Sequence, residues 1–183
     1  MVILLAKYVD MKKNFPIVIL FFCLVSYKVV GQTHNTEDSL QCEQLNTLSI
    51  KYYKDGQRDL LLHCTQKAVA LAEKTFGKYH KTYCTALNNL AFAYDVTGKY
   101  TDAETAYKEL LIILKQFIGE ETAMYATAIN NLGALYIKTG KYTYSEPLFK
   151  QALAIRKKVF GTNHRDYATS LNNLGNLYHT MGN

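Results

Sequence analysis

Three pairs of adjacent asparagines recur every 42 residues, and they are the side chains best suited to bind a ligand. A carboxamide offers two N–H donors and an oxygen acceptor, so a column of carboxamides can hold the backbone of an extended peptide without reading its sequence. The pairs are Asn88 and Asn89, Asn130 and Asn131, and Asn172 and Asn173. A second interpretation fits the same pattern: each asparagine could bond to a neighbouring element and hold one repeat against the next.

Other residues are expected to share the face of the asparagine pairs and to differ from copy to copy. Such non-repeating residues are the ones that can select a partner. The predicted peptide-binding set is therefore completed by Phe92, Asp95, Ile137, Lys138, Asn176 and His179. The same face also carries Thr85, Thr127 and Thr169.

The remaining candidates for chemistry have simpler explanations. His80 and His164 occupy equivalent positions just before a predicted helix, which favours a role in starting the helix over metal binding. Glu120 and Glu121 lie on a predicted linker, where an acid–base pair lacks the burial that catalytic carboxylates need. No phosphate-binding glycine loop and no Ser/His/Asp or Cys/His arrangement stands out. We predict a non-enzymatic protein without cofactor or metal.

The asparagine pairs belong to a longer repeat. Residues 84–125 align with residues 126–167 without a gap and share 18 identities in 42 positions. Two series of glycines keep the same interval: Gly56, Gly98, Gly140 and Gly182, and Gly77, Gly119 and Gly161. Self-similarity at a period of this length predicts a solenoid whose units bury their apolar faces against each other.

Each copy predicts two helices. Between Tyr125 and Thr139 the apolar residues follow the helical spacing i, i+3, i+4 and i+7. They are Ile129, Leu132, Gly133 and Tyr136. Gly140 is expected to end this helix. The second helix is predicted to begin with a T-x-x-E capping box at Thr101 and at Thr143, which places Pro147 near its first turn.

Small residues recur at one position of the first helix, at Ala91, Gly133 and Gly175. We expect them where the two helices of a pair cross, because a larger side chain there holds the backbones apart. The divergent first copy has Ser49 at this position, which predicts looser packing and a capping role for that copy.

These motifs resemble a known repeat family. Residues 132–136, "LGALY", the turn glycine 140, and then Tyr142, Ser145, Phe149 and Ala152 resemble the tetratricopeptide repeat. The longer 42-residue form is similar to the repeats of kinesin light chains, nephrocystin-3 and bacterial arrays that precede CHAT peptidase domains. The resemblance implies an all-α, right-handed α-solenoid of antiparallel helix pairs. It also implies that the second asparagine of each pair faces a peptide.

The N-terminus has the features of a targeting signal and is not expected to be part of the folded array. Lys12 and Lys13 precede the apolar stretch 15–26, which is typical of a signal peptide and short for a membrane span. We predict a leader at 1–31, a linker at 32–40 and a repeat array at 41–183. Export follows from the leader, and an uncleaved membrane anchor is the alternative. The true start is Met1 or Met11.

Charge and cysteine content narrow the class of partner. The net charge is +6, of which residues 1–31 contribute four lysines and one aspartate, or +3. Residues 32–183 therefore carry +3 with both signs interspersed, which disfavours nucleic acid. Three cysteines follow the leader, so a bridge from Cys64 to Cys42 or to Cys84 leaves one thiol over. Cys84 aligns with alanines, which predicts a small buried residue.

Taken together, the sequence predicts a protein-interaction scaffold that binds a peptide or protein segment in a concave groove. A different class is the sensing region of a larger enzyme, such as a CHAT-type peptidase, because the repeat pattern stops at Asn183 after one helix of the fourth copy. A purely structural spacer is the third possibility.

Overall fold

The computed structural model describes residues 36–182, and this part of the chain is helical without strands. The predicted leader and residues 32–35 of the linker lie outside the described residues. From Cys42 onward the chain forms one compact unit. A helix over residues 36–54 is followed by α2 (Arg58–Phe76), α3 (Lys81–Val96), α4 (Tyr100–Phe117), α5 (Ala123–Lys138), α6 (Tyr142–Phe160) and α7 (Arg165–Met181). None of the described helices is long and apolar enough to cross a membrane.

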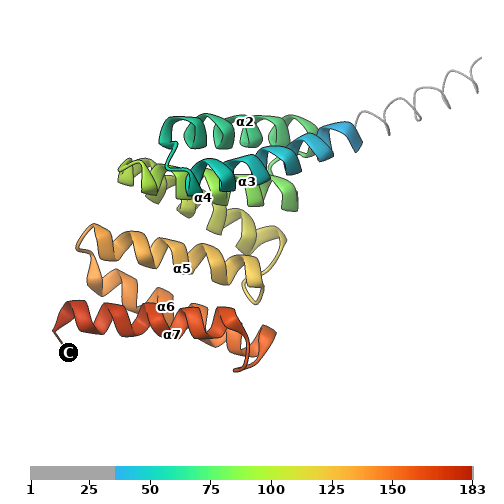
Figure 1. The fold of residues 1–183 in the computed structure, drawn as a ribbon. Helices are drawn as coiled ribbons and strands as arrows, with labels where there is room; N and C mark the ends of the chain where they lie inside the picture. Colours follow the sequence, from blue (N-terminus) through green and yellow to red (C-terminus); the bar gives the residue numbers. More distant parts are fainter. Residues whose placement is uncertain (1–35, 183) are drawn as a thin grey trace, which may run out of the picture. The chain divides into compact units, whose positions relative to one another are not determined.

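The helices form antiparallel pairs that stack along one direction (Figure 1). We call the first helix of each repeat helix A and the second helix B. Within a repeat, α3 packs against α4 and α5 against α6, and each helix B also packs against the next helix A. The apolar stripe predicted for α5 is buried as expected, at Ile129, Leu132, Gly133 and Tyr136.

A glycine turn joins the two helices of each pair. In the third repeat the Lys141 N–H donates to the Tyr136 carbonyl at 2.7 Å, and the Gly140 N–H donates to the Ile137 carbonyl at 3.1 Å. This is the Schellman pattern, which needs a positive φ at the glycine. Gly140 has a φ of 73°, and the equivalent Gly98 has 77°. The predicted role of these glycines in ending helix A is confirmed.

The predicted capping boxes of helix B are wrong. The Schellman turn places Lys99 and Lys141 at the N-cap, so α4 begins at Tyr100 and α6 at Tyr142. Thr101 and Thr143 therefore lie inside the helices, and neither N-cap side chain caps its helix. Pro147 lies deeper inside α6 than expected, because that helix starts before Thr143.

Helix A does begin with side-chain caps. The Nδ1 atoms of His80 and His164 accept hydrogen bonds from the N–H groups of Thr82 and Asp166, at 3.2 and 3.1 Å. The predicted helix-start role of the two histidines is confirmed. In the repeat between them, the Thr122 hydroxyl accepts from the N–H of Tyr125 instead.

The two helices of the third repeat cross at a glycine, as predicted. A Cβ built on Gly133 would lie 2.9 Å from Cε1 of Phe149, which is completely buried on α6. The Ser145 hydroxyl donates to the Gly133 carbonyl at 2.8 Å, which holds the helices together at the same point. At the equivalent position of α7, a Cβ on Gly175 would meet no atom within 4 Å. Gly175 was predicted to lie at a helix crossing like Gly133, but it has no such close contact among the described residues.

The three array cysteines are buried, and no disulfide joins them in the described part of the chain. Neither possible bridge of Cys64 is therefore present. Cys84 is completely buried, which confirms its predicted role as a small core residue. Burial raises the pKa of the Cys84 thiol, which disfavours the reactive thiolate.

In the second and third repeats, a glutamate of helix B forms a hydrogen bond with a tyrosine of the next helix A. Glu104 on α4 accepts hydrogen bonds from Lys108 and Lys141 at 2.7 Å and from the Tyr136 hydroxyl at 3.1 Å. Glu146 on α6 accepts from the Tyr178 hydroxyl of α7 at 2.9 Å. The glutamates of the expected capping boxes therefore hold successive repeats together.

The Glu104 cluster predicts a loss of stability in acid. Hydrogen bonds from Lys108 and Lys141, with that from Tyr136, lower the pKa of Glu104 from 4.5 to about 2. A pKa that is lower in the folded state stabilises the protein above the unfolded value, and the contribution is lost as the pH falls from about 4.5 to about 2. We expect Glu104→Gln to flatten the pH dependence of the free energy of unfolding in this range. Urea titrations at several pH values measure this free energy of unfolding for the wild type and the variant. Glu43→Gln, at an exposed position, is the control, and identical slopes for wild type and Glu104→Gln would contradict the assignment.

Candidate functional site

The asparagine pairs form a hydrogen-bonded ladder between successive A helices. The second asparagine of each pair donates from Nδ2 to Oδ1 of the first asparagine of the preceding repeat. The bonds run from Asn89 to Asn46 at 2.9 Å, from Asn131 to Asn88 at 3.2 Å and from Asn173 to Asn130 at 2.9 Å. These hydrogen bonds are the ones expected from the second interpretation, in which the asparagines hold one repeat against the next. Each of these bonds uses one amide N–H or one oxygen lone pair, so most of the amides keep capacity to bind a peptide. Asn130 is the exception on the acceptor side, because its Oδ1 also accepts from Nη1 of Arg156 at 3.5 Å.

Three other predicted site residues also lie in contacts between repeats. Lys138 on α5 forms an ion pair with Asp95 on α3 at 2.7 Å, and Asp95 is only 6% exposed. The ring of Phe92 packs edge-on against Tyr53 of the preceding repeat, with centroids 4.9 Å apart. These residues differ between repeats because each junction is built with its own pair. Their predicted role in selecting a partner stays a prediction.

The rest of the predicted set differs in exposure along the array. On α5, Asn130 is buried at 6% exposure and Ile137 is half-buried. On α7, the residues Asn172, Asn176 and His179 are exposed. The sequence alone places these positions on one face, but only the neighbouring helices determine how much of that face is covered.

The junction between the third and fourth repeats contains a buried arginine. Arg156 on α6 is 5% exposed, and its Nη1 donates to the Ser170 hydroxyl at 2.8 Å and to the Asp166 carbonyl at 3.1 Å. Its buried Nε atom has no hydrogen-bond partner among residues 36–182. Burial lowers the pKa of the guanidinium, and the nearby charge of Asp166 raises it. The preceding junction, between α4 and α5, has Leu114 and Ala128 at the positions of Arg156 and Ser170, so it lacks these polar groups.

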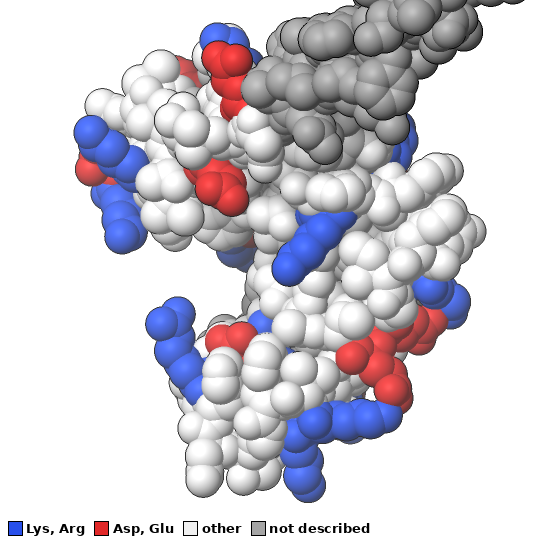
Figure 2. Space-filling model, turned by 90° about the vertical axis from the view of Figure 1, so that its right-hand side faces the viewer, with Lys and Arg blue, Asp and Glu red and all other residues white. Residues whose placement is uncertain are grey.

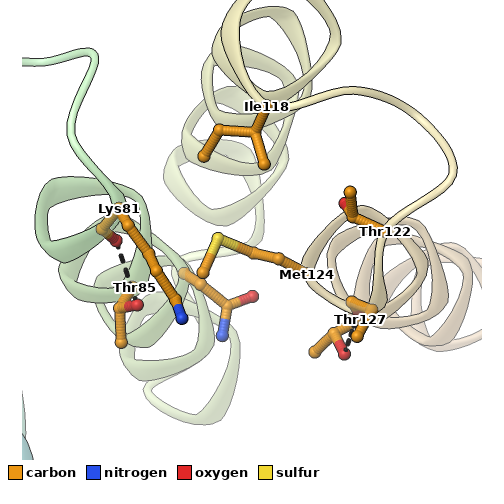
Figure 3. A pocket seen from close by; sticks show the side chains of 8 residues that line it. Lys81, Thr85, Ile118, Thr122, Met124 and Thr127 are labelled. Atoms are coloured by element: carbon orange, nitrogen blue, oxygen red, sulfur yellow. Dashed lines mark hydrogen bonds between the residues drawn. The ribbon is translucent and has the colours of Figure 1, made fainter.

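A pocket of about 550 Å³ opens between α3 and α5, at their N-terminal ends. Figure 3 shows Lys81, Ile118 and Met124 pointing into the space between the two helices. The residues that line it are Lys81, Thr85, Asn88, Ile118, Thr122, Ala123, Met124 and Thr127. Asn88 is therefore the one member of the predicted peptide-binding set that lines this pocket.

The pocket lies next to the linker between α4 and α5, whose sequence differs from that of the equivalent linkers before α3 and α7. In the linkers before α3 and α7, a phenylalanine stacks on the capping histidine. These pairs are Phe76 with His80 and Phe160 with His164, with ring centroids 4.6 and 4.2 Å apart. The linker before α5 has Ile118 and Thr122 at the same positions. The smaller pair leaves room between the helices, and we attribute the pocket to this exchange.

The pocket combines an apolar interior with one positive charge. Ile118 and Met124 supply apolar surface, while the hydroxyls of Thr85 and Thr127 and the amide of Asn88 supply polar groups. Lys81 has no ion-pair partner among the described residues, unlike Lys138 and Lys141 further along the array. Neither α3 nor α5 has an acidic residue in its first turn. This region of the surface therefore favours a ligand with an apolar side chain next to a negative charge.

The surface charge does not indicate a nucleic-acid interface. On the face shown in Figure 2, lysines and arginines stand close to aspartates and glutamates, with broad uncharged surface between the clusters. Several of these contacts are ion pairs, such as Lys115 with Glu120 and Lys158 with Glu121. A nucleic-acid site needs cations gathered along one face.

Sequence reasoning missed most of the pocket. The predicted peptide-binding set does not contain the lining residues Ile118, Thr122, Ala123 and Met124, because it was based on the face of helix A that carries the repeated asparagines. The available signal was the exchange of the Phe-x-x-x-His linker motif for Ile-x-x-x-Thr at 118–122.

The fold defines a helical repeat protein of the α-solenoid class, built from stacked antiparallel pairs. Two models of the tetratricopeptide repeat match the chain, over residues 84–121 and 124–183. The chain is a tetratricopeptide repeat protein with repeats like those of kinesin light chains. Its predicted architecture, a right-handed all-α solenoid, is confirmed. Repeats of this family generally mediate protein–protein interactions.

Solved structures show the same arrangement. The crystal structure of BtubC (BKLC) from P. vanneervenii is similar over 79% of this chain and 58% of its own, with a TM-score of 0.69 and 26% identity. A kinesin light chain-like protein of nearly identical TPR-like repeats from Podosopora anserina matches 76% of this chain and 66% of its own, with a TM-score of 0.71 and 21% identity. The present chain thus spans less than two thirds of either structure. No curated protein sequence matches it.

Proposed function

We propose that the array binds an extended segment of a protein partner along the face of the A helices that carries the asparagine pairs, which we call the A-helix face. The segment is anchored in the pocket between α3 and α5. The observation that carries this proposal is the pocket itself. It lies on helix A of two successive repeats and contains residues of the face predicted to bind, namely Thr85, Asn88 and Thr127. A scaffold role agrees with the general function of tetratricopeptide repeats.

The chemistry of the pocket specifies the anchor. A volume of about 550 Å³ accommodates one large apolar side chain, and burying such a side chain contributes about 1.5–3 kcal/mol. Lys81 stands at the same pocket without an ion-pair partner among the described residues and favours an acidic residue next to the anchor. The free donor and acceptor positions of the asparagine ladder hold the backbone that follows. The partner segment is therefore extended, with an apolar residue beside an aspartate or glutamate.

The test begins with selection of peptides from a random library on the full chain. We expect the selected peptides to contain an apolar residue beside an acidic one, and to bind more weakly as salt rises. Filling the pocket by Thr127→Trp is expected to weaken binding of the best peptide at least about tenfold, measured by titration calorimetry.

Thr169→Trp is the matched control. Thr169 occupies the same position on α7, where it is exposed and lies outside the 550 Å³ pocket. Equal binding by the two tryptophan variants would show that peptides bind elsewhere. Failure to select any peptide would contradict the proposed function as a whole.

A further inference from the structure

An exposed apolar surface lies on the outer side of α4, away from the A-helix face. We call it the α4 apolar surface and define it by Tyr79, Ile112 and Phe117, which are 63%, 59% and 54% exposed. The rings of Tyr79 and Phe117 are stacked at a tilt, with centroids 4.0 Å apart. Tyr79 and Ile112 also line a pocket of about 440 Å³, together with Ile113 of the same helix. Exposed apolar side chains gathered at one place, unlike scattered ones, mark interaction sites.

The repeat itself shows that the fold does not require these three side chains. The equivalent positions of the neighbouring repeats carry Ala70 and Ala154 for Ile112, Thr75 and Val159 for Phe117, and Glu121 and Asn163 for Tyr79. Each exchange makes the second repeat more apolar than at least one neighbour, and all three fall on one patch. Because the neighbours reach the same helix pairing without them, the patch serves something other than packing within the array.

The charges around the patch cancel one another. Lys78 pairs with Glu109 at 3.2 Å and with Glu73 at 3.7 Å. Glu104 pairs with Lys108 and with Lys141, each at 2.7 Å, so three lysines face three glutamates. A rim with equal numbers of both signs offers no net attraction to a strongly acidic or strongly basic partner. It does complement a copy of itself, because a twofold contact places lysines of one rim against glutamates of the other.

The shape of the patch is also self-complementary. It carries a hollow whose apolar lining is Tyr79, Ile112 and Ile113 and whose polar lining is Lys78, Thr105, Lys108, Glu109 and Gln116. The exposed ring of Phe117 stacks on Tyr79 and does not line that hollow. In a twofold contact the projecting ring of each copy faces the hollow of the other. From the apolar centre, the balanced rim and the paired hollow and ring, we propose that two copies of this chain associate through the α4 apolar surface.

This association is separate from the proposed peptide binding. The patch is formed by helix B and the linker before α3, whereas the 550 Å³ pocket is formed by α3, α5 and the linker between α4 and α5. Since the two pockets share no lining residue, a dimer formed in this way is expected to leave both 550 Å³ pockets open. It therefore presents two peptide-binding faces, which strengthens attachment to any partner that carries two copies of the recognised segment.

Sedimentation velocity of the full chain, over concentrations up to a few hundred micromolar, tests the proposal. We expect a reversible monomer–dimer equilibrium. The triple variant Tyr79→Asn, Ile112→Ala and Phe117→Thr takes each residue from the same position of another repeat, so it is expected to keep the fold, as circular dichroism checks. Its dimer dissociation constant is expected to rise at least about tenfold, and that of Ile112→Lys at least as much.

Tyr144→Asp is the matched control. Tyr144 is 64% exposed on α6, lies outside the patch, and is replaced here by the residue of the preceding repeat, Asp102. This variant is expected to dimerise like the wild type. A monomeric wild type throughout the range, or a triple variant that is folded and dimerises as tightly as the wild type, would overturn the proposal. Loss of dimer in the Tyr144→Asp variant to the same extent would overturn it as well.

Discussion

Phe149→Ala is expected to lower the free energy of unfolding by about 3–5 kcal/mol. Phe149 is completely buried, and its ring lies where a Cβ on Gly133 would come within 2.9 Å of it. The backbone of α5 therefore forms one wall of the site, and a backbone held by its own helix cannot collapse into the cavity. Urea denaturation followed by far-UV circular dichroism measures the loss.

Tyr144→Ala separates burial from the general effect of removing an aromatic ring. Tyr144 lies on the same helix but is 64% exposed, so its loss is expected to cost less than about 0.5 kcal/mol. Similar losses for the two variants would mean that the crossing of α5 and α6 does not depend on the ring of Phe149.

Gly133→Leu is expected to destabilise the array by about 1–3 kcal/mol, because the new side chain must displace the ring of Phe149 or push the two helices apart. Gly175→Leu provides a test at the same position of the repeat. No atom lies within 4 Å of a Cβ built there, and leucine has the higher helix propensity. We therefore expect Gly175→Leu to be neutral or stabilising, as measured by thermal melting.

The difference in melting temperature between the Gly133→Leu and Gly175→Leu variants is the quantity that tests the helix crossing. If both leucine variants melt alike, helix propensity rather than the crossing governs the position. Combining Gly133→Leu with Phe149→Ala adds a second check, because the cavity left by the ring can accept the leucine. The double variant is then less destabilised than the sum of the two single variants, as expected for residues in direct contact.

The proposed binding face and the proposed dimer face depend on residues that break the repeat. Ile118 and Thr122 replace a stacked phenylalanine–histidine pair and open the pocket between α3 and α5. Tyr79, Ile112 and Phe117 replace smaller or more polar residues and expose an apolar surface on α4. The repeated residues maintain the solenoid, and the departures from the repeat distinguish one unit from another.

Much of the fold could be predicted from the sequence, because it depends on local and periodic features. The apolar spacing around Ile129 and Leu132 identified helix A, and the glycine series located the turns, since a Schellman turn requires a left-handed residue at one fixed position. The 42-residue interval then fixed the architecture, because identical units bury apolar surface only against each other.

The starts of helix B could not be predicted in the same way. Thr101 and Thr143 have the spacing of a capping box, but the preceding Schellman turn sets the helix start at Tyr100 and Tyr142. Glu104 is then free to reach Tyr136 on α5 and Lys141 at the N-cap of α6, which are 32 and 37 residues away. Local motifs compete with such distant partners, and the sequence does not show which partner is within reach.

By itself, the sequence determined that this protein is an array of helix pairs, where each pair turns, and which face of helix A is polar. Only the tertiary structure decided what that face does at each position: that Asn131 bonds to Asn88, that Asp95 is covered by Lys138, and that a pocket opens beside Met124. The physical reason is that periodicity fixes the direction of a side chain relative to its own helix axis. Its partner, its burial and the space beside it depend on the side chains of the next repeat.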